Sequence, residues 1–271
     1  MPDPIKNLTE DEKQQVEDHK PPPAKVVHAS VSKMGEEELA RPASSLFWSA
    51  VAAGVSMMAS VSVAGALHHA LPDAPWREAV TALGYPVGFL IVVLGRMQLF
   101  TEQTVVAILP FARASTWYNF KRVARLWGLV LAGNIAGSAA VAALAWFAKV
   151  QPPEVLDGML AVSARLQQSS PLQIGLTAIP AGFLMASVAW INSAEEQIGF
   201  PIVLALTLAI GLCHFAHVIA GSAEAWLLLW SGKATLGWVV FGFTLPALIG
   251  NVVGGTGLFA VLAHAQVREE I

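Results

Sequence analysis

The chain has 271 residues, of which 55% are hydrophobic and 13% charged, and its formal net charge is −3. Soluble domains average roughly 45–50% apolar and about 25% charged residues, so this composition indicates a membrane protein. The basic residues form only a juxtamembrane cluster, which gives no support for nucleic-acid binding. No nucleophile, base and orienting group occur at a recognisable spacing, so we expect no enzyme and no cofactor.

Residues 1–42 are polar, mixed in charge and interrupted by three consecutive prolines at 21–23. Such a segment cannot bury enough apolar surface to fold alone, so we expect a cytoplasmic N-terminal extension that is largely disordered or holds a short helix. Thr9 and Glu12 have the spacing of a capping box that would open such a helix. A solvated tail and a regulatory or partner-binding segment are both open interpretations.

Six apolar segments follow, and each reaches or approaches the roughly 20 residues that a helix needs to cross the hydrocarbon core. We therefore expect an all-α membrane protein with a six-helix transmembrane domain over residues 43–267 and a short cytoplasmic end over residues 268–271. The segments are 43–76, 84–110, 126–148, 166–194, 197–223 and 234–267.

Basic residues near the spans predict the orientation of the chain. They precede the first span and crowd the connection between the second and the third, and such clusters face the cytoplasm. Six spans then place both termini in the cytoplasm, and no cleaved secretory signal is visible. The residues are Lys33, Arg41, Arg113, Lys121, Arg122 and Arg125.

Two of the apolar segments carry ionisable groups where a span should have none, at residues 95–102 and 214–224. Each is followed by a similar signature, which begins at Gly133, 32 positions after Thr101, and at Gly250, 33 positions after His217. This spacing indicates an internal duplication. Ionisable groups in interrupted spans of two matching halves are typical of a transport protein whose site lies near the bilayer midplane.

The repeated signature consists of two glycines four residues apart, with an asparagine after the first. Small residues at this spacing let two helix backbones approach closely in lipid, so we expect packing helices there. The asparagine amides need partners inside the protein. They either brace the interrupted helices or line the path. The residues are Gly133, Asn134, Gly137, Gly250, Asn251 and Gly254.

Thr101 and His217 are the candidate residues of the substrate pathway. The imidazole has an unperturbed pKa of about 6.5, so it can attract an anion or pass it a proton. The alternative is a histidine that is hydrogen-bonded within a helix core. Leu99 and Phe100 precede Thr101 and would form a narrow constriction beside a break in the helix. His214 lies three residues before His217, but nothing supplies further ligands, so we expect no metal site.

Arg96, Glu102 and Glu224 are the charged residues inside the interrupted spans. An unpaired charge at this depth is costly, so an intramembrane ion pair is expected. Arg96 would pair with Glu224 and join the two halves, or with Glu102. Arg96 would also supply a potential that attracts anions, and these roles are compatible.

These motifs resemble the formate/nitrite transporter family, and within it a divergent bacterial branch of YfdC-type inner-membrane proteins. The resemblance covers about residues 44–265. It implies an aquaporin-like fold, with six helices in an inverted three-plus-three repeat whose second and fifth helices are interrupted. It also implies a homopentamer in a bacterial inner membrane, with a pore in each protomer.

In this resemblance Thr101 faces His217 between apolar constrictions that Leu99 and Phe100 match, with Phe89 as a further lining residue. A small monovalent anion is drawn inward, gains a proton near the histidine and crosses as a neutral acid. The chain departs from the family pattern at Glu102-Gln103 and at Gly221. Two alternatives stay open: an aquaporin-like channel for small neutral solutes, and a non-conducting membrane protein with a partner-binding tail.

Overall fold

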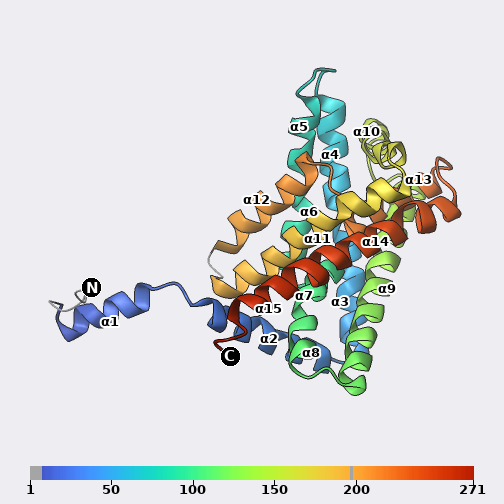
Figure 1. Cartoon of the computed structure of the whole chain (residues 1–271). Coiled ribbons are helices and arrows are strands. Elements are labelled where there is room, and N and C mark those ends of the chain that lie inside the picture. Colours follow the sequence, from blue (N-terminus) through green and yellow to red (C-terminus); the bar gives the residue numbers. More distant parts are fainter. Residues whose placement is uncertain (1–7, 196–197) are drawn as a thin grey trace.

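The structure is a computed structural model that describes residues 8–195 and 198–271. Its elements are helices of the α, 3-10 and π types, gathered into one body from which α1 projects (Figure 1). In chain order they are α1 Glu10–His19, α2 Ala24–Ala40, α3 Ala43–Ser56, α4 Met58–Ala70, α5 Arg77–Thr81, η1 Ala82–Gly84, α6 Pro86–Leu94, α7 Phe100–Val106, α8 Ile108–Arg113, α9 Trp117–Phe147, α10 Pro153–Ser163, η2 Ala164–Gln168, α11 Pro171–Ala194, α12 Gly199–Leu212, α13 Val218–Trp230, η4 Trp238–Thr244, α14 Leu245–Val252, η5 Val253–Ala260 and α15 Val261–Val267.

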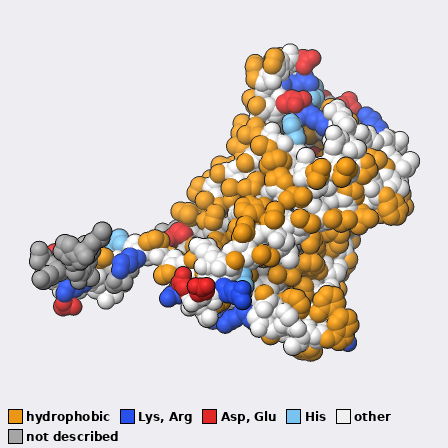
Figure 2. Space-filling view, in the orientation of Figure 1, with side chains coloured by type: hydrophobic (Ala, Val, Ile, Leu, Met, Phe, Trp, Pro, Cys, Tyr) orange, Lys and Arg blue, Asp and Glu red, His pale blue; other side chains and the backbone are white. Residues whose placement is uncertain are grey.

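The expectation of an all-α protein with membrane-spanning helices is confirmed. Within the described residues, five helices are long and apolar enough to cross a membrane: Ala43–Ala70, Arg77–Leu94, Trp117–Phe147, Pro171–Ala194 and Trp238–Val267. Hydrophobic side chains cover the middle of the visible face of the helical body, and charged side chains gather towards its ends (Figure 2). This distribution matches a protein whose middle faces acyl chains.

The second and fifth predicted spans are each divided into shorter helices. The second continues beyond α6 as α7 and α8, and the fifth consists of α12 and α13, which are apolar but shorter than a full span. The two divided spans hold the motifs that the sequence marks as interrupted.

Two matching helix crossings hold the body together. At the first, glycines 133 and 137 of α9 pack against the backbone of α3, and Gly54 of α3 packs against α9. At the second, glycines 250 and 254 of the last long helix pack against the backbone of α11, and Gly182 of α11 packs against Asn251. A Cβ atom at any of these glycines would overlap a backbone carbonyl of the facing helix. Backbones this close need a residue without a side chain.

The structure differs from the expectation that residues 1–42 are largely disordered or hold a short helix. The capping box is present, because the Thr9 amide donates to Glu12 Oε2 at 2.8 Å and the Glu12 amide donates to Thr9 Oγ1 at 3.3 Å. However, residues 24–40 form the 17-residue helix α2, whose buried side chains pack against α7, α8, α11 and α15. Its apolar positions Val27, Val31 and Leu39 recur near the helical period, and this pattern supplies the buried face.

Candidate functional site

The two divided spans are broken by the same backbone turn. The breaks are residues 95–99, between α6 and α7, and residues 213–217, between α12 and α13. The second residue of each break, Arg96 or His214, has a left-handed conformation with φ of 50° or 51°. In each break the next amide donates to a carbonyl five residues back, at 2.9 Å and 3.0 Å respectively. This is the Schellman arrangement that ends a helix, here with a non-glycine residue in the left-handed position.

Asn134 of α9 holds the first break open. Its Oδ1 accepts a hydrogen bond from the amide of Phe100, the first residue of α7, at 2.9 Å. Its Nδ2 donates to the carbonyls of Ala50 and Gln98, both at 2.8 Å. The side chain thus satisfies one amide and one carbonyl that the break removes from helical hydrogen bonding, and it ties both to α3.

Asn251 of α14 does the same at the second break. Its Oδ1 accepts from the amide of Val218 at 2.8 Å, and its Nδ2 donates to the carbonyls of Ala178 and Ala216 at 2.8 Å and 3.0 Å. Both asparagines are fully buried. The geometry therefore corresponds to bracing of the interrupted helices, one of the two roles that the sequence left open.

The two breaks also correct the register of the duplication. The Asn251 contact makes Val218 the equivalent of Phe100, so His217 is the equivalent of Leu99 and not of Thr101. Leu99 and His217 have nearly the same backbone conformation, with φ and ψ of −107° and 125° for Leu99 and −114° and 122° for His217. The spacing of the glycine signatures does not fix the register to within two residues.

Thr101 and His217 nevertheless meet at the centre of the molecule. Thr101 Oγ1 lies 2.8 Å from His217 Nε2, and both residues are buried. His217 Nδ1 accepts a hydrogen bond from the amide of Ala220 at 3.2 Å, which caps the start of α13. Because an amide only donates, Nδ1 carries no proton, so the neutral ring bears its proton on Nε2 and donates to Thr101.

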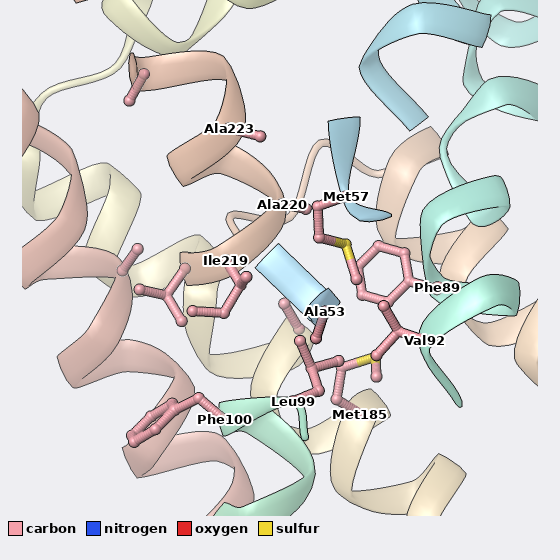
Figure 3. Packing of buried hydrophobic residues seen from close by; sticks show 14 of the residues in the cluster. Ala53, Met57, Phe89, Val92, Leu99, Phe100, Met185, Ile219, Ala220 and Ala223 are labelled. Carbon is pink, nitrogen blue, oxygen red and sulfur yellow. The ribbon is translucent and has the colours of Figure 1, made fainter. Parts of the chain in front are cut away.

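A layer of apolar side chains, drawn in Figure 3, contacts this pair through Phe89. Phe89, Val92 and Leu99 lie together there with Met57 and Met185. All five are fully buried. The layer contacts the imidazole directly, because the Phe89 ring stands edge-on to His217 with the ring centroids 4.9 Å apart.

Phe100 lies elsewhere. Its ring is directed away from Leu99 and Phe89 (Figure 3) and packs edge-on against Trp127 of α9, with the ring centroids 5.7 Å apart. The Trp127 indole also donates to the carbonyl of Gln103 at 3.1 Å. In this conformation Phe100 anchors α7 to α9, and Leu99 alone of the two residues belongs to the apolar layer.

Two cavities approach the central pair. The first cavity, of about 430 Å³, reaches His217 and is lined by residues of α4, α5, α12 and α13 among others. The second, of about 650 Å³, is lined by residues of α2, α6, α7 and α11, and by those of the first break. The described residues that line the cavities include neither Phe89, Leu99 nor Thr101. A packed layer of residues therefore separates the two cavities.

The three charged residues of the interrupted spans divide between these cavities. Arg96 and Glu102 line the second cavity, whereas Glu224 lines the first. The structure thus places Arg96 and Glu102 on the wall of one cavity and Glu224 on the wall of the other. The left-handed turn at Arg96 also gives this residue a structural role that its charge alone did not indicate.

Sequence reasoning missed a polar network that links α2 to the first break. Gln98 Nε2 donates to Glu38 Oε2 at 2.9 Å, Gln103 Nε2 donates to Gln98 Oε1 at 3.0 Å, and Arg41 pairs with Glu38 at 3.1 Å. Glutamine 98 was visible as a polar residue in an apolar span, but Glu38 and Arg41 lie in the segment interpreted as a tail. The pair of Arg165 and Glu78 in the first cavity was missed as well.

Comparison with known proteins gives a consistent result. The sequence model of the family described as "Formate/nitrite transporter" matches residues 25–265. The chain is 36% identical over 257 residues to "Inner membrane protein YfdC" of Escherichia coli (strain K12), with 94% of this chain and 82% of that protein covered. It is 29% identical over 207 residues to "Uncharacterized transporter YrhG" of Bacillus subtilis (strain 168), with 70% and 74% covered.

Two solved structures share the fold. One, a "Pentameric formate channel with formate bound", has a TM-score of 0.71 at 18% identity and covers 84% of this chain and 98% of its own. The other, an "FNT family ion channel", has a TM-score of 0.73 at 16% identity and covers 90% of this chain and 98% of its own. The match in fold extends over both halves of the chain.

Proposed function

Because the chain belongs to the formate/nitrite transporter family, we propose that it is a transmembrane channel or transporter for small monovalent anions or their neutral acids. The observation that carries this proposal is the buried hydrogen bond of 2.8 Å between Thr101 and His217. This polar pair lies beside an apolar layer and between two cavities. Polar groups at membrane depth are costly and are typically found where a substrate passes.

The broken helices supply an electrostatic reason for anions. α7 and α13 both begin beside the central pair, at Phe100 and Val218. The first amides of a helix carry a partial positive charge that favours negative groups. Half-helix ends directed at a midplane site serve the same purpose in other transporters. The central region therefore favours an anion over a cation before any side-chain charge is counted.

The apolar layer selects for the neutral form of the permeant. Phe89, Val92 and Leu99 offer no hydrogen bond, and an unpaired ion in such surroundings costs far more than a neutral polar molecule. An anion that gains a proton in a cavity crosses the layer as an acid. At the layer it exchanges hydrogen bonds with the Nε2–H of His217 and the hydroxyl of Thr101, which lie 2.8 Å apart in the structure.

The proposal includes the arrangement of the six spans and the assembly of the chains. The matched glycine crossings and asparagine contacts support an inverted three-plus-three repeat of six spans, in which 77–113 and 199–230 are the interrupted second and fifth spans. Apolar side chains such as Trp48, Leu172 and Phe241 are exposed on the single chain. They suit contacts with lipid and with further copies in a homopentamer, the assembly named for one structural neighbour.

The orientation follows from the ends of the chain. Helix α2, near the start of the chain, and the C-terminal end lie towards the same end of the helical body (Figure 1). Arg113 and Arg122 belong to that end through α8 and the start of α9, and basic residues favour the cytoplasmic side. In this orientation the second cavity opens to the cytoplasm and the first to the opposite side of a bacterial inner membrane.

Flux through purified protein in lipid vesicles tests the function. Formate, nitrite and acetate are expected to enter faster than into empty vesicles, with a flux that rises as the external pH falls. Glycerol and water provide the test of the neutral-solute alternative. Flux of glycerol that is independent of pH, without flux of any acid, would replace the proposal by that alternative.

A further inference from the structure

One face of α13 follows the first cavity from the centre of the molecule outward. His217, Ala220, Gly221 and Glu224 all line this cavity. Residues spaced by three, four and seven positions share one face of a helix. With a rise of about 1.5 Å per residue, Glu224 lies about 10 Å along the helix axis from His217. Its carboxyl group therefore belongs to the wall that an entering substrate passes.

A second carboxyl group has the corresponding place on the other side. Glu102, Gln103 and Val106 of α7 line the second cavity. Each half-helix that follows a break thus carries one glutamate into the cavity on its own side of the apolar layer. The two glutamates are not at equivalent positions of the repeat, so the duplication itself does not account for them.

Two of the arginines that line the cavities, Arg165 and Arg41, have carboxylate partners other than Glu224 and Glu102. In the first cavity, which Tyr85 and His214 also line, Arg165 pairs with Glu78 at 3.1 Å. His214 Nε2 lies 3.8 Å from the same Glu78.

In the second cavity Arg41 pairs with Glu38 at 3.1 Å, and Glu38 also accepts a hydrogen bond from Gln98. Arg96 also lines that wall. Carboxylates at such depths are stable when paired or protonated, and they repel an anion unless they are protonated.

The central histidine is poorly placed to donate the proton itself. Its Nδ1 is occupied by the amide of Ala220, and its Nε2 faces Thr101. A doubly protonated ring would set an N–H against the Ala220 N–H and remove the cap of α13. It would also place a cation at the positive end of that helix. The geometry keeps His217 as a neutral hydrogen-bond donor.

We propose that Glu224 and Glu102 are the proton-exchange groups of this pathway, one on each side of the apolar layer. The proposal rests on the proposed function. An anion in the first cavity forms an O–H bond as the O–H bond of the protonated Glu224 breaks, and the neutral acid crosses the layer. The acid then gives its proton to the carboxylate of Glu102. Water protonates Glu224 again and removes the proton from Glu102, so one anion and one proton cross together.

The experiment compares labelled acetate flux at pH 7.5 and pH 5 in vesicles that contain wild-type protein or a variant, after subtraction of the flux into empty vesicles. Glu224→Gln is expected to lower the flux at pH 7.5 about ten-fold or more. At pH 5 its flux is expected to return towards that of the wild type, because the bulk solution then supplies neutral acid. Glu224→Asp, which keeps the carboxyl group, is expected to retain part of the flux at both values.

Glu154→Gln provides the matched control, since Glu154 is an exposed glutamate in α10. It is expected to behave as the wild type. If the wild type transports acetate and the Glu224→Gln variant transports it equally well at pH 7.5, the inference is overturned but the proposed function is not. A Glu224→Gln flux that stays low at pH 5 also overturns it, because that residue would then act through structure. Absence of acid flux in the wild type overturns the proposed function.

Discussion

Leu99 and His217 occupy the same position in the two halves of the chain, each as the last extended residue before a half-helix. In one half this position holds an apolar side chain that joins the layer at the centre. In the other it holds an imidazole that caps α13 and donates to Thr101. The site is therefore built by two halves with a shared backbone and different side chains. This asymmetry gives the central region both its apolar layer and its hydrogen-bond donor.

The hydroxyl group of Thr101 is the partner of that donor. Thr101→Val removes the hydroxyl at nearly constant shape and leaves the buried Nε2–H without a partner, at a cost of about 1–3 kcal/mol. We expect a lower melting temperature and a lower acid flux. Thr101→Ser keeps the hydroxyl and is expected to preserve both. Equal melting temperatures for the valine variant and the wild type would argue against the hydrogen bond.

The two roles of His217 can be separated with two substitutions. Asparagine is a good N-cap residue but is too short to reach Thr101, whereas alanine does neither. We expect His217→Asn to lose acid flux while it keeps most of the stability. His217→Ala should lose the flux and, in addition, about 1 kcal/mol of stability. Flux and thermal unfolding measured on the same vesicle preparations check this, and a fully active asparagine variant would remove the imidazole from the pathway.

The buried amides of Asn134 and Asn251 are expected to be equally important for the two breaks. Asn134→Ala leaves the Phe100 amide and the Gln98 carbonyl unpaired, and Asn251→Ala leaves those of Val218 and Ala216 unpaired. At about 1–3 kcal/mol for each buried group, both variants should lose most of their folded yield.

Asn→Asp at either site keeps the acceptor but sets a carboxyl oxygen against two backbone carbonyl oxygens, so we expect a loss at least as large as that of the alanine variants. Hydrogen exchange at residues 95–102 and 213–220 measures where the structure opens. Each variant should lose protection from exchange at the break that its asparagine contacts. Loss of protection only at the other break would contradict the assignment.

Two glycines of α9 offer a matched pair. A Cβ at Gly137 would overlap the carbonyl of Val51 in α3, whereas one at Gly128 meets nothing within 4 Å. Gly137→Ala is expected to separate α3 from α9 and lower the melting temperature. Gly128→Ala should be neutral or stabilising by up to about 1 kcal/mol, since alanine favours helices. A Gly137→Ala protein with unchanged stability would show that the two helices can move apart freely.

The contact of α2 with the end of the chain is expected to weaken in acid. His28 is buried, its Nε2 lies 3.2 Å from His264 Nδ1, and its ring packs against Trp190. Burial, and then the nearby His264 and Arg113, lower the pKa of His28 below its usual value. A lowered histidine pKa favours the neutral ring in the folded state, so stability falls as the pH drops below about 6.5 and levels off below the folded-state pKa.

Hydrogen exchange of α2 at pH 7.5 and pH 5 measures this effect. Because amide exchange is itself base-catalysed, the rates are compared as protection factors, and we expect lower protection over residues 24–40 at pH 5 than at pH 7.5 in the wild type. His28→Phe should make the protection there insensitive to pH, as the ring is retained without a titratable group. An equal acid response in both proteins would assign it to other residues.

The sequence was sufficient to predict the class of fold and the location of the breaks. Charged and polar residues within apolar segments have few physical explanations, and Gly-Asn-x-x-Gly repeats mark both close packing and a buried amide. These signals lie within short stretches of sequence, so a single sequence is enough to recognise them. Thr101 and His217 were singled out as candidates for the same reason, since each is polar at membrane depth, and the structure brings them within 2.8 Å of one another.

The register between the halves could not be predicted in this way. The number of residues between a break and the glycine signature that follows it differs by one between the halves. This spacing alone does not show that His217 takes the place of Leu99. The packing of α2 was missed for two reasons. Lysine and glutamate residues lie between its apolar positions, and the burial of its apolar face depends on contacts with α8, α11 and α15. The direction of the Phe100 ring depends on Trp127, which lies on a different helix.

The most direct test of the account is the uptake of labelled formate into vesicles that contain purified wild-type protein or its Thr101→Val variant, at external pH 7.5 and 5.5. The account predicts saturable uptake by the wild type that rises at the lower pH, and uptake at least several-fold slower by the variant at both. Uptake by the wild type no faster than into empty vesicles at either pH, or equal uptake by the two proteins, would contradict it.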